Sequence, residues 1–168
     1  MSTVDRHRLP FDPIQEAARQ WQAHWDEMPR MRAVTSLMRV HQLVLTELDE
    51  LLRPLGLTFA RYEVLVLLSF SRRGALPLGK IGERLQVHAT SVTPLVKRLE
   101  AAELIRRTPH PEDGRAVLAS ITQKGRMVMD QATEAIVGAR FALGSMSESD
   151  CDQLTELLTR PRAAAGDF

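Results

Sequence analysis

Hydroxyl and cationic side chains are gathered in one short segment of the chain, residues 90–98. A hydroxyl group can hydrogen-bond to a nucleic-acid base edge or to a phosphate, and a lysine or arginine can reach guanine acceptors or the phosphate backbone. A proline ring in such a segment can contact the methyl group of thymine. These residue types favour recognition of a polar, negatively charged partner. The candidate recognition residues are Thr90, Ser91, Thr93, Pro94, Lys97 and Arg98.

The apolar residues of the same segment have the spacing of a helix. At about 100° per residue, Leu95, Val96 and Leu99 fall within about 60° of Val92 and form one ridge that faces a core. The polar residues lie on the opposite side. The pattern predicts a helix over 90–103 that is half core and half polar surface, a shape that fits the major groove. An ordinary solvent-exposed helix has the same pattern, so composition alone leaves both interpretations open.

Three further arginines flank the tip of a predicted β-hairpin. Arg106 and Arg107 precede the tip, and Arg115 follows it. Prolines limit the freedom of the tip, so a guanidinium is presented there at modest entropic cost, and arginine is the side chain drawn into narrow minor grooves. Asp113 is placed to hold the tip or to orient Arg115. A solvent-exposed turn whose corner is Asp113 and Gly114 is the alternative interpretation.

The elements that must position these groups are mostly helices. Apolar residues recur every three or four positions over long stretches, whereas the segments on either side of the hairpin tip are short and rich in β-branched residues. The predicted helices are 12–26, 30–53, 59–71, 78–86, 90–103, 122–143 and 147–160, and the predicted strands are 104–108 and 116–121. Two short helices followed directly by a hairpin make a winged helix-turn-helix. The expected fold class is therefore mainly α, a winged helix-turn-helix with a two-stranded β-hairpin wing.

Charge is distributed unevenly along the chain. The formal net charge is only +1, from 22 Lys and Arg, 21 Asp and Glu, and neutral histidines. Residues 72–126, however, carry 11 basic and 5 acidic side chains, a balance of +6 that the rest of the chain offsets with −5. Such asymmetry is expected where one face of a protein meets phosphates. This basic third contains both groups of candidate recognition residues.

Composition excludes several other classes of protein. At 168 residues, with 44 % hydrophobic and 26 % charged side chains, the chain has the size and composition of one globular domain. Cys151 is its only cysteine, so no internal disulfide can form, and a reducing cytoplasmic location is expected. We expect Cys151 itself to be inert. No apolar stretch approaches the ~20 residues of a membrane span, so no membrane partner is expected.

An enzyme is the rival class. The sequence contains no glycine-rich phosphate loop, no metal-spaced cluster of His and Cys, and no nucleophile elbow. His110, Glu112 and Asp113 cluster, but they do so at the hairpin tip, where nothing would exclude water or fix their geometry. We therefore expect a non-enzymatic protein with no cofactor and no metal. A winged helix used only for protein–protein contacts is the other alternative, and it would leave the basic third unexplained.

Several of these motifs together resemble the MarR family of bacterial transcription regulators. The resemblance runs from about residue 31 to residue 160. Its most specific part is the wing, where an Asp-x-Arg is followed by the Thr-x-x-Gly start of a helix. The helix-turn-helix part is shared with many regulators. The matching motifs are Leu78–Leu85, Thr90–Glu100, Leu104–Arg107, Pro111–Arg115 and Ile121–Gly125.

This resemblance implies a sequence-specific regulator that binds a pseudo-palindromic operator in double-stranded DNA as a homodimer, with half-sites about one helical turn, ~10 bp, apart. Thr90, Ser91, Thr93, Lys97 and Arg98 match positions of the recognition helix, and Asp113 and Arg115 match the wing pair. The implied organisation is an N-terminal extension with a tryptophan-bearing helix over 1–29, a dimerisation helix over 30–58, a winged helix-turn-helix DNA-binding lobe over 59–126, and C-terminal dimerisation helices with a tail over 127–168.

The resemblance also implies a repressor that is released from DNA by a small aromatic acid, bound between the dimer helices and the winged lobe. Aromatic walls and one cation for a carboxylate would suit such a ligand. The candidate lining residues are Trp21, Trp25, His41, Arg61 and Tyr62. The alternative for the two tryptophans, four residues apart, is that they dock their helix on its neighbour, and the alternative for His41 is a hydrogen-bonded interface residue.

Overall fold

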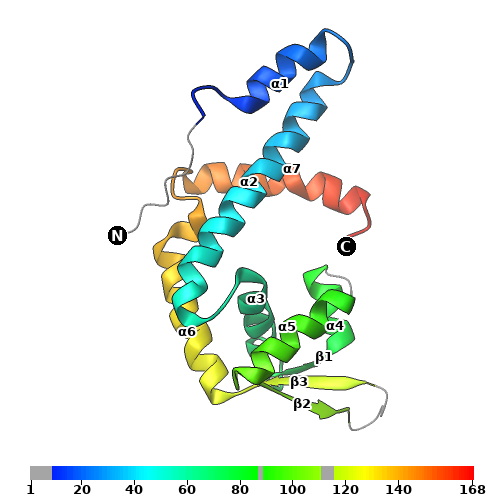
Figure 1. Cartoon of the computed structure of the whole chain (residues 1–168). Helices are drawn as coiled ribbons and strands as arrows, with labels where there is room; N and C mark the ends of the chain where they lie inside the picture. Colours follow the sequence, from blue (N-terminus) through cyan, green and yellow to red (C-terminus); the bar gives the residue numbers. More distant parts are fainter. Residues whose placement is uncertain (1–8, 87–88, 111–115) are drawn as a thin grey trace. The chain divides into compact units, whose positions relative to one another are not determined.

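The computed structural model describes residues 9–86, 89–110 and 116–168, without the side chains of residues 89 and 90. The chain divides into two compact units, Met1–Leu45 and Thr46–Phe168. Seven α-helices and a small sheet make up the described residues (Figure 1). In this described part of the chain, no helix is both long enough and apolar enough to cross a membrane.

The first unit begins with a capped helix, as the sequence predicts. The side chain of Asp12 accepts a hydrogen bond from the backbone N–H of Ile14 (2.9 Å) at the start of α1 (Pro13–Gln22). The helix ends before the predicted residue 26, and the indole N–H of Trp21 closes the following turn by donating to the carbonyl of Asp26 (2.7 Å). The long helix α2 (Met28–Leu52) then starts one residue before Pro29. A proline in the first turn removes a donor that has no helical partner there.

Helix α3 (Phe59–Ser69) lies at the centre of the second unit. The side chain of Thr58 caps it by accepting from the backbone N–H of Arg61 (3.4 Å). Its apolar face is fully buried, and it packs against α4, α5, α6 and the sheet. The other helical elements of this unit are the 3₁₀ turn η1 (Arg53–Leu55), α4 (Leu78–Leu85), α5 (Ala89–Ala101), α6 (Gln123–Gly138), the turn η2 (Arg140–Ala142) and α7 (Glu148–Ala164).

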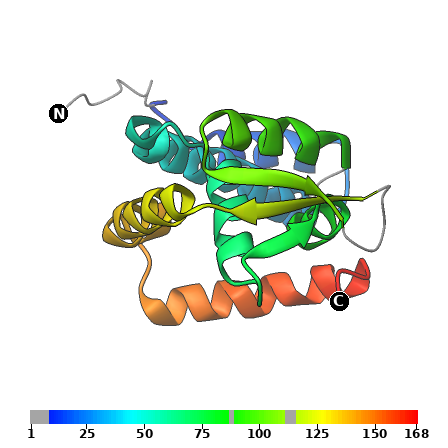
Figure 2. The ribbon, with the colours of Figure 1, turned by 90° about the horizontal axis from the view of Figure 1, so that it is seen from below.

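The wing hairpin is present, but the sheet has a third strand that the sequence analysis missed. Strand β3 (Val117–Ile121) pairs antiparallel with both β1 (Ala75–Pro77) and β2 (Ile105–Pro109), in the order β1–β3–β2 (Figure 2). The predicted two-stranded wing, β2 and β3, is thus confirmed, and β1 extends the sheet to three strands. With only three residues and a proline, β1 has no strand periodicity to detect. As an edge strand it tolerates Pro77, because an edge strand has a free side that needs no donor.

The helix predicted over 122–143 is shorter than expected. It ends at Gly138, and Arg140, Phe141 and Ala142 follow with left-handed backbone angles (φ 50°, 52° and 59°). Three such residues in succession turn the chain sharply before α7, whose N-terminus is closed by a capping box between Ser147 and Asp150. Helix α7 also runs past its predicted end, through Pro161 to Ala164.

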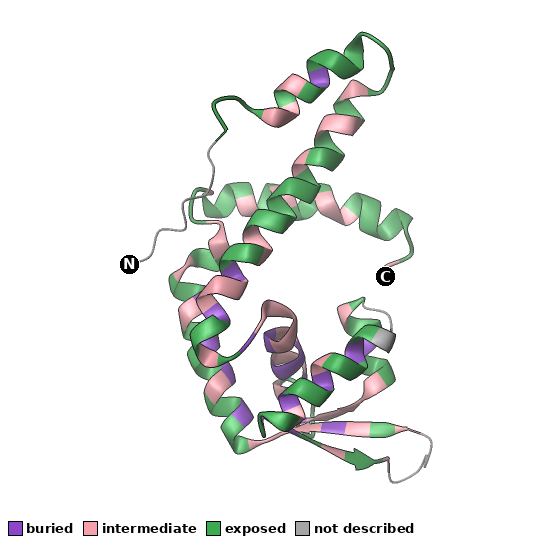
Figure 3. Cartoon of the chain, viewed as in Figure 1, coloured by how far each residue is buried: buried purple, intermediate pink, exposed green. Residues whose placement is uncertain are grey.

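The core of the second unit lies between the helices and the inner face of the sheet (Figure 3). Helix α3 supplies its centre, α5 and α6 each contribute one buried face, and the sheet closes it from below in the view of Figure 1. The largest fully buried side chains are Leu52, Val64, Leu65, Leu68, Ile81, Val92, Val96, Leu99 and Ile136. Burying side chains of this size contributes about 1.5–3 kcal/mol each.

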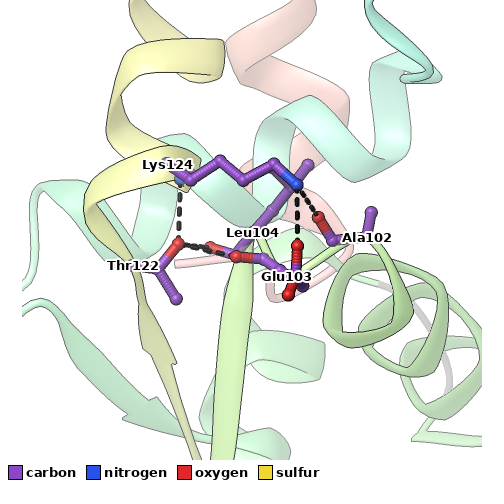
Figure 4. A network of polar contacts seen from close by, with 6 residues as sticks. Ala102, Glu103, Leu104, Thr122 and Lys124 are labelled. Carbon is purple, nitrogen blue, oxygen red and sulfur yellow. Dashed lines mark hydrogen bonds and ion pairs between the residues drawn. The ribbon is translucent and has the colours of Figure 1, made fainter.

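A polar junction joins the segment after α5, the start of β2 and the start of α6 (Figure 4). The carbonyl of Leu104 accepts from both the backbone N–H (3.0 Å) and the hydroxyl (3.1 Å) of Thr122. The ammonium of Lys124 donates to the carbonyl of Ala102 (2.9 Å) and pairs with the carboxylate of Glu103 (3.1 Å). Thr122 is also the N-cap of α6, so the junction fixes where that helix begins.

Gly125 lies too close to the backbone of Leu104 to accommodate a side chain. A Cβ at this position would lie 2.0 Å from the carbonyl oxygen of Leu104. Because that oxygen belongs to the backbone and already accepts two hydrogen bonds, it has little room to move. We expect Gly125→Ala to lower the free energy of unfolding by roughly 2–3 kcal/mol in urea denaturation.

The matched control is Gly138→Ala, in the same helix. A Cβ there meets nothing within 4 Å, so stability should stay unchanged or rise by up to about 1 kcal/mol. Equal stability of the wild type and Gly125→Ala would contradict the close approach of α6 to Leu104.

Candidate nucleic-acid interface

Helix α5 is anchored by the ridge that the periodicity predicts. Val92, Val96 and Leu99 are buried, and Leu95 is half-buried. The helix packs on α3, α4 and β2. One side of α5 is therefore buried in the core. Its packing on α3, α4 and β2 fixes the direction in which the opposite side faces.

The opposite side of α5 is open and polar. Ser91 and Thr93 are exposed in the first turns, and Pro94, Lys97 and Arg98 are exposed after them. Thr90 belongs to the helix, but its side chain lies outside the described residues. Pro94 lies inside α5, in its second turn, and leaves one helical hydrogen bond unmade. The structure thus places the described members of the predicted set on a single solvent-facing surface.

Arg61 is a third cation close to this surface. Arg61 of α3 donates to the carbonyl of Gly56 (2.8 Å) and to the hydroxyl of Thr58 (3.2 Å). Burial lowers the pKa of Arg61, and the nearby charge of Arg98 lowers it further, while Asp49 acts in the opposite direction. The proximity of Arg61 and Arg98 makes the local potential positive, which favours an anionic partner.

The two arginines of β2 have opposite environments. Successive side chains of a strand point to opposite faces of the sheet. Arg107 faces inward, where its guanidinium forms an ion pair with Glu100 of α5 at 2.6 Å. Arg106 faces outward and is exposed beside a cavity of about 380 Å³ over β2, β3 and the start of α6. Arg107 is therefore engaged within the lobe, whereas Arg106 is available to a partner.

The wing strands remain paired up to the tip. Pro109 pairs with Val117, and the backbone N–H of His110 donates to the carbonyl of Ala116 (2.9 Å). Asp113 and Arg115, the predicted wing pair, lie outside the described residues. Their positions in the sequence place them in the connection between these two strands.

The structure also shows a basic groove that the sequence analysis did not single out. Its cations are Arg72 and Arg73, after α3, and Arg84, in the last turn of α4. Together with Phe70, whose exposed fraction is 83 %, they line a cavity of about 590 Å³. The arginines belong to the +6 segment, which was the available signal, but only the tertiary fold brings Arg84 to the other two.

The candidate effector residues of the first unit are exposed. The rings of Trp21 and Trp25 lie 6.3 Å apart at 45°, and each side chain remains accessible to solvent. His41 is exposed on α2. The two tryptophans thus contact each other, as expected for aromatic residues four positions apart in and after a helix.

The candidate effector residues of the second unit are adjacent on α3 and have partners inside it. Tyr62 is buried, and its hydroxyl lies 3.0 Å from that of Thr133 on α6. Arg61 is held by Gly56 and Thr58. These contacts give both side chains a structural role in joining α3 to its surroundings.

The comparisons with known proteins agree with this geometry. The sequence model of the MarR family matches residues 57–117. The organic hydroperoxide resistance transcriptional regulator of Bacillus subtilis is 35 % identical over 108 residues, which cover 64 % of this chain and 71 % of that protein. The HTH-type transcriptional repressor MdtR of the same bacterium is 30 % identical over 132 residues, which cover 77 % of this chain and 83 % of that protein.

Among solved structures, Sco5413 from Streptomyces coelicolor, a MarR family transcriptional regulator, is similar to this chain. The two share 49 % of their residues with a TM-score of 0.79, over 83 % of this chain and 97 % of that one. The similarity confirms the mainly helical winged fold. All these relatives are transcription regulators, in agreement with the expectation that the chain is not an enzyme.

The ion pair between β2 and α5 predicts a pH-dependent stability. The hydrogen bond from the Arg107 side chain is the main reason that the pKa of Glu100 lies below its usual value, and burial acts in the opposite direction. A carboxylate with a lowered pKa stabilises the fold at neutral pH, and this contribution is lost as the pH falls through that pKa. We expect Glu100→Gln to lower the melting temperature by about 1–3 °C at pH 7.

The difference between wild type and Glu100→Gln should shrink as the pH falls through the lowered pKa of Glu100, because below it both chains carry a neutral group at this position. Arg106→Gln is the control, because Arg106 lies on the outer face of the same strand and should leave the melting temperature unchanged. Equal melting temperatures of wild type and Glu100→Gln at pH 7 would show that the ion pair does not hold the wing.

Proposed function

The chain belongs to the MarR family of transcription regulators, and we propose that it binds an operator in double-stranded DNA as a homodimer, with α5 in the major groove. In this proposal α5 meets base edges and phosphates through its open face, and the wing reaches the minor groove or its phosphates. The proposed contact residues are Thr90, Ser91, Thr93, Pro94, Lys97 and Arg98 of α5, and Arg106, Asp113 and Arg115 of the wing.

The observation that carries the proposal is the division of α5 into two sides. The buried ridge holds the helix rigidly on the lobe, while hydroxyls and two cations stand exposed on the other side. This face lies in the one third of the chain that has a net charge of +6 over residues 72–126. Arg107 contributes indirectly in this proposal, because its pairing with Glu100 ties the wing to α5.

The proposed dimer would bury an apolar face of α2. Val34, Leu37 and Met38 recur at helical spacing and have exposed fractions of 55 %, 44 % and 59 %. Such a row of exposed apolar side chains marks a protein contact. We assign residues 30–58 and 127–168 to dimerisation and 59–126 to DNA binding. A two-fold axis would then present two lobes to half-sites about 10 bp apart.

The proposed mode of action is repression relieved by a ligand. The name of MdtR describes a transcriptional repressor, and MdtR matches this chain over 83 % of its own length. The exposed Trp21 and Trp25 offer aromatic surface for a small aromatic acid. The other predicted lining residues, His41, Arg61 and Tyr62, remain a prediction from the sequence. Cys151 is half-buried in the first turn of α7 and has no part in this mechanism.

Fluorescence anisotropy tests the DNA-binding proposal. The protein should prefer a duplex from the region upstream of its own gene over a scrambled duplex, and the preference should persist at about 150 mM salt. Lys97→Ala should weaken binding to the native duplex about 10-fold, by removing a contact to a base or a phosphate. Adding small aromatic acids such as benzoate to the same assay should release the DNA.

Arg19→Ala provides a charge-matched control on α1, far in sequence from the basic third, and should leave DNA affinity unchanged. Equal, salt-sensitive binding to both duplexes would refute specific reading of this DNA. Failure of a folded protein to bind either duplex would favour a winged helix that serves protein–protein contacts. Unchanged affinity in the presence of the acids would argue against ligand-relieved repression by this chemical class.

The apolar face of α2 gives a separate prediction. Replacing both Leu37 and Met38 with Glu should convert the protein from a dimer to a monomer, because two like charges on each subunit would be buried against each other. Light scattering coupled to size-exclusion chromatography measures the mass directly. Arg39→Ala, at the neighbouring exposed position, should leave the mass unchanged. A wild type that elutes as a monomer would rule out the dimer.

A further inference from the structure

We propose that the C-terminal end of α7 braces the turn of the helix-turn-helix, and that Asp167 is a positioning residue for the recognition helix α5. The proposal rests on the proposed DNA-binding function. It concerns a contact between two segments that lie 81 positions apart in the sequence, Gln86 at the end of α4 and Asp167 beyond the end of α7.

The position of Asp167 is set by the way α7 ends. Gly166 has a left-handed backbone (φ 74°), and its N–H donates to the carbonyl of Ala163 (3.0 Å). The N–H of Asp167 donates to the carbonyl of Arg162 (3.1 Å). These two bonds form a Schellman motif, which satisfies the last carbonyls of a helix and reverses the chain. Asp167 is thus held by the helix cap and is not part of a loose tail.

The carboxylate of Asp167 has two partners. It forms an ion pair with the guanidinium of Arg162 at 2.6 Å and accepts a hydrogen bond from the side-chain amide of Gln86. Its side chain is only 15 % exposed, although it lies near the end of the chain. The guanidinium of Arg162 in turn lies 5.3 Å from the ring centre of Phe168. Arg162 neutralises the carboxylate, so the contact brings no net negative charge to the DNA-binding lobe.

Gln86 occupies a sensitive place in the lobe. It is the C-cap of α4, with left-handed angles (φ 51°, ψ 34°) that a glutamine adopts only at a cost in energy. The chain leaves α4 at Gln86, and α5 begins at Ala89. Holding the Gln86 side chain therefore stabilises the first residue of the turn that sets the direction of α5. In Figure 1 the short segment after α7 turns toward this end of α4.

Through this contact, a movement of α7 would change the orientation of α5. In the proposed dimer α7 belongs to the dimerisation region, so a shift of α7 would pull on Asp167 and release Gln86. The turn would then lose a restraint, and α5 would sample more orientations. Specific binding needs one orientation of α5, whereas non-specific binding needs only its charge. Loss of the brace should therefore lower discrimination between DNA sequences.

Asp167→Ala in the full-length chain tests the proposal. We expect affinity for the native duplex to fall about 3- to 10-fold, as for the loss of one charge-assisted hydrogen bond, while affinity for the scrambled duplex and the mass of the protein stay unchanged. The melting temperature should fall by no more than about 1–3 °C. Gln86→Ala should have the same effect. The double variant should be no weaker than either single one, because both remove the same contact. Arg160→Ala, on the same helix, is the control and should bind as wild type does.

Hydrogen exchange provides a readout that does not require DNA. The amides in the last turn of α4 and the first turn of α5 should exchange faster in Asp167→Ala, and those of β2 and β3 should not. Unchanged exchange, additive effects of the two substitutions, or equal losses on both duplexes would each overturn the brace. If the wild type shows no preference between duplexes, the DNA-binding proposal fails, while the exchange experiment still decides whether the brace exists.

Discussion

The close approach of α6 to the backbone at Leu104 is the constraint on which the DNA-binding lobe depends. The carbonyl of Leu104 accepts two hydrogen bonds from Thr122, and the absence of a side chain at Gly125 lets the helix come within contact of the same oxygen. This point follows the end of α5, precedes β2 and adjoins the start of α6. One arrangement of backbone atoms therefore fixes the recognition helix, the wing and the helix that leads away from the lobe.

Next to this junction, neighbouring residues of one element have different environments: some are buried or paired within the lobe, and others are exposed. On α5 the ridge of Val92, Val96 and Leu99 is buried, whereas Thr93, Pro94, Lys97 and Arg98 face solvent. On β2, Arg107 is half-buried and pairs with Glu100 of α5, whereas Arg106 is exposed. The periods of the helix and the strand separate structural from exposed groups. The exposed faces of α5 and β2 can thus vary without disturbing the groups that hold the lobe together.

Sequence reasoning recovered the features that follow from burial at a regular period. The helices, the hairpin and the polar face of α5 belong to this class, because apolar residues must recur on one side of each element. It missed β1, because three residues with a proline have no period, and it missed the end of α6, because left-handed turns at Arg140 and Phe141 have no local signal without glycine. Alternation along 104–108 could have separated Arg106 from Arg107. The groove of Arg72, Arg73 and Arg84 could not be found, because it requires the tertiary fold.

The left-handed turn between α6 and α7 has a consequence for the order of folding. Each of Arg140, Phe141 and Ala142 adopts a backbone that costs an L-residue roughly 1 kcal/mol or more. Local preference would instead continue the helix, so the bend exists only when contacts elsewhere stabilise it. The lobe carries its own core and can form first, whereas no residue of α7 is buried. The direction of α7 is therefore set by contacts made across the folded molecule and not by the local preference of residues 140–142.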